Sequence, residues 1–201
     1  VYGSTRRFVI EEFPRLNIKY DFYDPRNLND LENLINENTK VIYLESPGTY
    51  TFEVIDITKV VEICKKNNLK SIIDNTWATA LFFNPLEFGV NIVVEAITKY
   101  ISGHSDIMMG VVIANGQDLI AIQRWTKNAG VYVSPDDIYM SLRGLRTLPL
   151  RLKQSSENSL ALAKYLEIQD EIKAVQHPAL KQHPDHGLWK KYFKGASGLF
   201  A

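Results

Sequence analysis

Short apolar runs alternate with amphipathic stretches over the first half of the chain. The stretch from Leu28 to Asn38 and the stretch from Ile57 to Asn67 carry apolar residues at helical spacing, and NPLEFG (84–89) reads as a turn. Strands separated by helices are typical of a parallel sheet crossed by helices, so the pattern predicts an α/β fold built from βαβ units. The predicted strands are IKYDFY (18–23), VIYLES (41–46), LKSIIDN (69–75), NIVVEA (91–96) and GVVIAN (110–115).

From about Asp118 the hydrophobic period becomes helical and stays so to Glu167. Pro135 is placed near the start of a helix, and the run that follows predicts a long helix linking two parts of a larger protein. The segments IKAVQHPAL and HPDHGLWKKYF then begin a second unit. We therefore predict that residues 1–147 form part of a large domain, and that 148–201 form a linker helix and the beginning of a C-terminal α/β domain.

The two ends of the sequence predict that it is an internal segment of a longer chain. It opens on Val1 without a start methionine, and it closes on SGLFA, a strand-like apolar run that stops as it begins.

Composition and charge exclude several classes of partner. The 201 residues are 45% hydrophobic, enough for a sizeable core, and 23 basic residues balance 23 acidic ones. Nucleic acid and anionic membrane surfaces are therefore poor partners, and no apolar run is long enough to span a bilayer. The single cysteine, Cys64, fits a buried apolar side chain in a reducing compartment, so we expect a cytoplasmic protein.

Polar residues follow three predicted strands at the edge where open α/β sheets bind ligands: Glu45-Ser46, Asp74-Asn75-Thr76 and Thr98-Lys99. An acid and an amine at adjacent strand ends could form a salt bridge and nothing more. However, Lys99 enters a loop directly from the apolar run VVEAI, and a desolvated amine is a better nucleophile and base. With the Thr98 hydroxyl and a loop at Gly103, these are the parts of a Schiff-base site with an acid to protonate a pyridine nitrogen, as in pyridoxal phosphate enzymes.

Other candidate sites are weaker. His183 and His186 in HPDH have the spacing of a metal pair, but no third ligand is near in sequence, so we expect a solvated loop and no metal. Arg143 and Arg146 could bind an anion, but a helix surface packed with leucines explains them equally well. Trp125, like the other scattered aromatic residues, reads as core or interface.

The segment DNTWATALFFNPLEFGVNIVVEAITKYISGHSD (74–106) resembles the lysine-containing signature of the pyridoxal-phosphate enzymes of cysteine and methionine metabolism, with ITKYISGHSD as its most specific part. The likeness extends over nearly the whole chain, through VYGSTRRF, LESPGTYTFEV, LRGLRTLPLRLKQ and HPALKQHPDHGLWKKYFKGASGLF. It implies the large domain of a fold-type I transferase, a mostly parallel sheet flanked by helices. It also implies pyridoxal 5'-phosphate as cofactor, a small amino-acid substrate, and a homo-oligomer, either dimer or tetramer.

Carried over residue by residue, the resemblance implies a role for each of several side chains. Lys99 holds the cofactor and takes the substrate's α-proton, and Asp74 pairs with the pyridine nitrogen. Thr98 hydrogen-bonds the phosphate, and Tyr2 stacks on the ring. His104 belongs to the loop that supports the site.

Details of the sequence resemble the cystathionine β-lyases within that family. Trp77 stands where most relatives have phenylalanine, Ala96 stands where many have serine, and ESPGTYT lacks the asparagine of the corresponding turn. Asn91, where aspartate is more frequent, reads as a tolerated surface or turn change. The resemblance implies β-elimination from cystathionine to homocysteine, pyruvate and ammonia.

Two alternatives stay open. One is a γ-specific relative such as cystathionine γ-synthase, cystathionine γ-lyase or methionine γ-lyase. The other is a segment that folds but does no chemistry, because the family's phosphate-binding turn lies before Val1 and its carboxylate-binding arginine lies beyond Ala201. In that case we expect an unpaired strand edge and exposed core residues.

Overall fold

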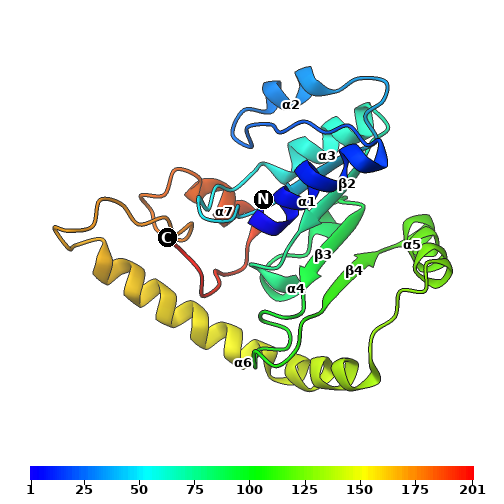
Figure 1. The fold of residues 1–201 in the computed structure, drawn as a ribbon. Coiled ribbons are helices and arrows are strands. Elements are labelled where there is room, and N and C mark those ends of the chain that lie inside the picture. The colour runs from blue at the N-terminus through cyan, green and yellow to red at the C-terminus, as the bar shows by residue number, and fades with distance from the viewer.

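A four-stranded sheet of order β1-β2-β3-β4 forms the centre of the molecule in a computed structural model that describes residues 1–201 (Figure 1). The first three strands are parallel, and β4 runs antiparallel to β3. The strands are β1 (Val41–Glu45), β2 (Lys70–Asp74), β3 (Ile92–Ala96) and β4 (Gly110–Ala114). Because β1, β2 and β3 are parallel, their carboxyl ends meet at one edge of the sheet.

Helices surround this sheet. They are α1 (Gly3–Glu12), η1 (Pro14–Leu16), α2 (Leu28–Leu34), α3 (Ile57–Lys66), α4 (Thr79–Phe82), η2 (Pro85–Phe88), α5 (Gly116–Asn128), α6 (Pro135–Leu166) and α7 (His186–Tyr192). The longest, α6, begins where sequence chemistry favours it: the Ser134 side chain accepts the Asp137 N–H at 3.1 Å, and Pro135 occupies the first turn, where no intrahelical donor is needed.

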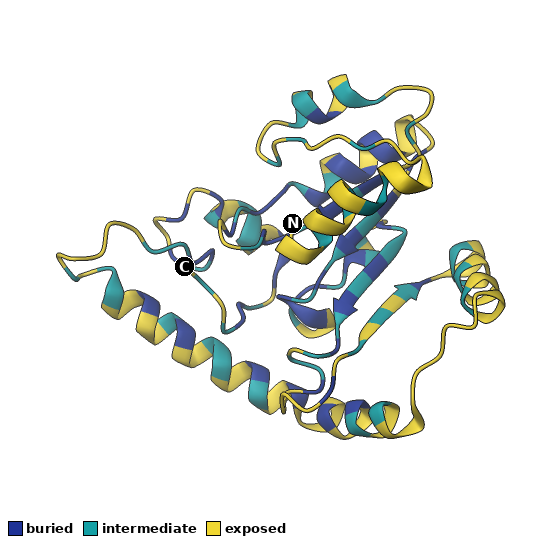
Figure 2. Ribbon diagram, in the orientation of Figure 1, coloured by how far each residue is buried: buried dark blue, intermediate teal, exposed yellow.

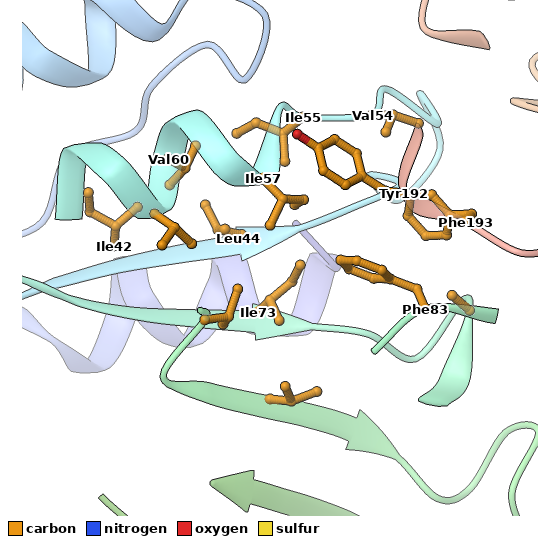
Figure 3. Close-up of a cluster of buried hydrophobic side chains, with 14 of the residues drawn as sticks. Ile42, Leu44, Val54, Ile55, Ile57, Val60, Ile73, Phe83, Tyr192 and Phe193 are labelled. Carbon is orange, nitrogen blue, oxygen red and sulfur yellow. The ribbon is translucent and has the colours of Figure 1, made fainter. Parts of the chain in front are cut away.

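The hydrophobic core lies between the sheet and α3 (Figure 3). Alternate residues of the strands point into it, among them Ile42, Leu44 and Ile73, and α3 adds a buried face at helical spacing. Each such side chain contributes about 1.5–3 kcal/mol when it is fully buried. Tyr192 and Phe193, from the far end of the chain, join the same cluster.

The structure confirms the predicted α/β class and four of the predicted strands, and it corrects one. Residues 18–23 run as irregular backbone and form no strand. An apolar pattern can favour extended geometry, but a strand also needs a neighbouring strand to pair with its backbone groups, and the sheet contains only β1 to β4. The VYGSTRRF segment, for which the sequence pattern predicts no element, forms most of α1.

The predicted domain boundary falls inside a continuous helix. α6 passes through residues 147 and 148 and includes Pro149, so no break marks the division there. Buried residues from 192–196 pack into the first core, and SGLFA forms no strand. The division into a large domain and the beginning of a second one therefore stays a prediction.

Many residues of α1, α5 and the first half of α6 are exposed (Figure 2). Large apolar side chains are among them, such as Phe8 on α1, Trp125 on α5 and Leu142 on α6. On the outer strands, Val41 and Val112 are 47% and 48% exposed. No helix combines the length and apolar character that crossing a membrane requires.

Candidate active site

Asp74 is the last residue of β2 and is half-buried. Its Oδ1 accepts the backbone N–H of Thr76 at 2.9 Å, while Oδ2 has no hydrogen-bond partner. The Thr76 hydroxyl in turn accepts the N–H of Ala96 at 2.8 Å, which ties the turn after β2 to the end of β3. The acid is thus held at the sheet edge with one oxygen available.

Lys99 lies in the turn that follows β3. The turn is closed by the Ser102 N–H donating to Ile97 O and the Gly103 N–H donating to Lys99 O, each at 2.9 Å. The expected desolvation of Lys99 is wrong for this structure: its side chain is exposed, because β3 ends at Ala96 and the turn carries the lysine beyond the apolar part of the strand. The amine makes no hydrogen bond or ion pair.

Thr98 is engaged within the chain. Its hydroxyl donates to Met109 O at 3.1 Å and accepts the Met109 N–H at 2.9 Å, which closes the base of the loop between them. A hydroxyl has one proton to donate, so binding a phosphate through it requires release of Met109. His104 lies in the same loop, with Nδ1 2.6 Å from Ser102 O, as expected of a residue that supports the loop.

Glu45, the last residue of β1, connects Tyr2 to this edge. Its carboxylate accepts the backbone N–H of Tyr2 and the hydroxyl of Thr49, and it stands opposite Asp74 in the β1–β2 ladder. Burial raises the pKa of Glu45, although the hydrogen bond from Thr49 lowers it. The charge of Asp74 adds to the rise. Tyr2, the residue just before α1, is 47% exposed. The sequence indicates Glu45 only as the end of a strand, and it does not predict these contacts with Tyr2 and Thr49.

These side chains match pyridoxal phosphate in part. The free amine of Lys99 could react with the cofactor's aldehyde, and the unpaired oxygen of Asp74 could accept from its pyridine nitrogen. The ring of the exposed Tyr2 could stack on the face of the cofactor's ring. For the phosphate, the donor expected from Thr98 is already used by Met109. The residues present therefore fit the reactive ring of the cofactor better than its phosphate.

A second acid, which sequence reasoning also missed, is buried beside Asp74. Glu95 on β3 is 4% exposed, and its Oε1 accepts the side-chain N–H of Asn75 at 3.0 Å. Burial raises the pKa of Glu95 to about 7, although the hydrogen bond from Asn75 lowers it. The charge of Asp74 adds to the rise. The presence of this charged residue within the apolar run VVEA is the sequence feature that could have indicated a buried acid.

Asn91 and the HPDH segment differ from expectation. Asn91 Oδ1 accepts the N–H of Ser71 at 2.9 Å and its hydroxyl at 3.1 Å, so this asparagine joins the starts of β2 and β3 and is no passive surface change. The expected solvated loop at 183–186 is wrong for His183, which is 5% exposed, because Asp185 binds Arg26 and the backbone N–H of Val54.

The structure also describes the surroundings of the histidine pair and of the two arginines. No group of His, Cys, Asp and Glu residues is arranged to hold a metal ion. Arg143 pairs with Asp106 of the loop after Lys99, at 3.1 Å, while Arg146 is exposed.

The chain is similar in sequence and in structure to several known proteins. A cystathionine beta-lyase from Haemophilus influenzae is 40% identical over 202 residues, and an L-alanine/L-glutamate racemase from Wolbachia pipientis wMel is 44% identical over 200 residues. The alignments cover 100% of this chain and 51% and 49% of those relatives, so the chain spans about half of their length. A crystal structure of cystathionine gamma-lyase from Lactobacillus plantarum complexed with L-serine superposes with a TM-score of 0.95 at 29% identity, over 100% of this chain and 53% of that one.

The family model described as Cys/Met metabolism PLP-dependent enzyme matches residues 1–201. The match takes in the carboxyl edge of the sheet, with the acid at the end of β2 and the lysine after β3. The chain therefore belongs to the pyridoxal-phosphate-dependent enzymes of cysteine and methionine metabolism.

Proposed function

We propose that this chain carries the reactive lysine and acid of a carbon-sulfur lyase of the cystathionine β-lyase type. The observation that supports the proposal most strongly is the placement of Asp74 and Lys99 at neighbouring parallel strand ends, in a chain of a pyridoxal-phosphate-dependent family. The β-lyase assignment rests on the likeness to relatives of that name.

In this proposal each residue has one task. Pyridoxal phosphate, when bound, supplies an electron sink for a substrate carbanion. Lys99 holds the cofactor and takes the α-proton, Asp74 keeps a proton on the pyridine nitrogen, and Tyr2 lies against the ring. Thr98 serves the phosphate once Met109 releases its hydroxyl. The β carbon–sulfur bond of cystathionine then breaks, and with one water the products are homocysteine, pyruvate and ammonia.

We further propose that the protein acts on a small amino acid in the cytoplasm as a homo-oligomer. The lone buried Cys64 favours a reducing compartment. Support for self-association comes from the exposed apolar side chains of α5 and α6, which a second copy could cover.

A racemase is the second candidate, favoured by the 44% identity to the L-alanine/L-glutamate racemase. Such a reaction uses the same acid and lysine to remove the α-proton, and a proton is then returned to the opposite face without breaking a bond to sulfur. A γ-specific lyase is a further alternative, favoured by the structural likeness to cystathionine gamma-lyase.

Product analysis separates these candidates. The chain with pyridoxal phosphate is given L-cystathionine, L-alanine and L-glutamate in turn, with a Lys99→Ala variant as control. Pyruvate with homocysteine, absent in the variant, is the expected result. Formation of 2-oxobutyrate with cysteine, or of D-alanine or D-glutamate without pyruvate, contradicts the β-lyase assignment. If no substrate gives a product, the result favours the alternative that this segment folds but does no chemistry.

A further inference from the structure

Arg151, in the middle of α6, directs its guanidinium to the turn that carries Lys99. It donates to Tyr100 O at 2.7 Å and to Ile101 O at 3.2 Å. It also donates to Gly144 O at 2.7 Å and to the Thr147 hydroxyl at 3.0 Å, and it has no acidic partner. All of its hydrogen bonds thus go to neutral oxygens, and two of those belong to the two residues directly after Lys99.

Two glycines permit this close approach. A Cβ atom at Gly144 would overlap the backbone oxygens of Ile101 and Ser102, and one at Gly103 would overlap the Arg151 guanidinium. Gly103 also has φ +68°, a conformation that side chains disfavour. Helix α6 therefore lies directly against the Lys99 turn, below the end of β3 and the start of β4 in Figure 1.

Taking a guanidinium partly out of water without a counter-charge has a cost, and only several hydrogen bonds offset it. The planar fork of arginine can reach several carbonyl oxygens at once, which the point charge of lysine cannot do in the same geometry. The inner bonds of the turn, from Ser102 and Gly103, fix its shape. The Arg151 bonds fix its position relative to α6.

We propose that Arg151 is a positioning residue that locks the turn after β3 against α6 and so holds Lys99 at the sheet edge beside Asp74. The role rests on the proposed function of Lys99, but the packing of the turn can be tested without it. Arg151 itself touches neither substrate nor cofactor in this proposal.

Amide hydrogen exchange tests the packing. In Arg151→Gln, and in Gly144→Ala, which forces the turn away from α6, the Ser102 and Gly103 amides should exchange about tenfold faster, the effect of losing one or two ordinary hydrogen bonds. Amides of β2 should not change, and Arg146→Gln, an exposed arginine on the same helix, is the matched control. Unchanged exchange at Ser102 and Gly103, or faster exchange throughout β2 as well, overturns the proposal, since the second result makes Arg151 a residue of overall stability.

The second readout is the reactivity of Lys99 with pyridoxal phosphate and borohydride, measured relative to the exposed Lys65. The ratio should fall about tenfold in Arg151→Gln and stay at the wild-type value in Arg146→Gln, because a freed turn no longer holds the amine beside Asp74. An unchanged ratio in Arg151→Gln contradicts the positioning role. If the wild-type chain shows no preference for Lys99, the proposed function fails, while the exchange result still decides whether Arg151 fixes the turn.

Discussion

Glu95 shows how a single side chain can make this fold sensitive to pH. It is buried next to Asn75, and its pKa is raised from 4.5 to about 7, first by burial and then by the charge of Asp74, against the hydrogen bond from Asn75. Because the folded-state pKa is the higher one, the stabilisation is complete below about pH 4.5 and is lost as the pH rises through about 7. The fold is therefore expected to weaken over this window.

Glu95→Gln should remove that loss, since glutamine imitates the neutral acid. Urea unfolding should show the variant more stable than wild type by about 1–3 kcal/mol at pH 8 and nearly equal to it at pH 4. Glu87→Gln is the matched control, because Glu87 also accepts from an asparagine, Asn84 at 3.0 Å, but is exposed. A pH dependence of Glu95→Gln that parallels wild type would contradict the assignment.

For single residues, the sequence predicts those features that depend only on neighbouring positions in the chain. The positions of Asp74 and Lys99 follow from the ends of apolar runs, and the structure places both at the expected edge. Their chemical roles stay predictions. The bonds of Thr98 to Met109 and of Arg151 to Tyr100 depend on how a loop and a distant helix close in space, and no local pattern encodes them.

Helix α7 shows the corresponding limit for whole elements. The sequence predicts only that the segment HPDHGLWKKYF, which includes α7, belongs to the beginning of a second unit. In the structure the Tyr192 hydroxyl donates to Asp56 and lies 2.7 Å from the Thr58 hydroxyl, at the start of α3. Just after α7, the Phe193 ring centroid lies 4.7 Å from that of Phe83 (Figure 3). The end of the chain therefore packs into the core between the sheet and α3.

Tyr192→Phe tests this contact, because it removes the hydroxyl and keeps the packed ring. We expect a loss of about 1.5–3 kcal/mol in the free energy of unfolding, as for hydrogen bonds to a charged group. Tyr165→Phe is the control, since Tyr165 lies 59% exposed on α6 and its hydroxyl has no partner. Equal stability of the two variants would show that α7 is not tied to α3 through Tyr192.

For the whole molecule, the most prominent feature is the set of exposed apolar side chains on α5 and the first half of α6. Figure 2 shows that both segments carry many exposed residues. Ile138, Leu142 and Leu145 on α6 are 45%, 55% and 47% exposed and are spaced so that they share one helix face. Helical periodicity predicted the helix, but not that this face would lack a partner within the chain. A contiguous apolar face of this kind marks a surface for association.

Sedimentation measures that association directly. We expect the wild-type chain to sediment as an oligomer at micromolar concentration, and Leu142→Glu to shift it toward monomer, because a buried unpaired carboxylate is costly at an interface. Lys153→Glu, a charge change at an exposed polar position of the same helix, should have little effect. A wild-type chain that stays monomeric at all concentrations would contradict the homo-oligomer proposal.

Whether Lys99 and Asp74 form a pyridoxal phosphate site is measured by treating the chain with the cofactor, reducing it with borohydride and mapping the modified peptide by mass spectrometry. Asp74→Asn is the control, because asparagine keeps an oxygen for the Thr76 N–H but loses the negative charge. We expect modification concentrated at Lys99 and strongly reduced in Asp74→Asn. Modification scattered over many lysines, or equal at Lys99 in both proteins, would contradict it.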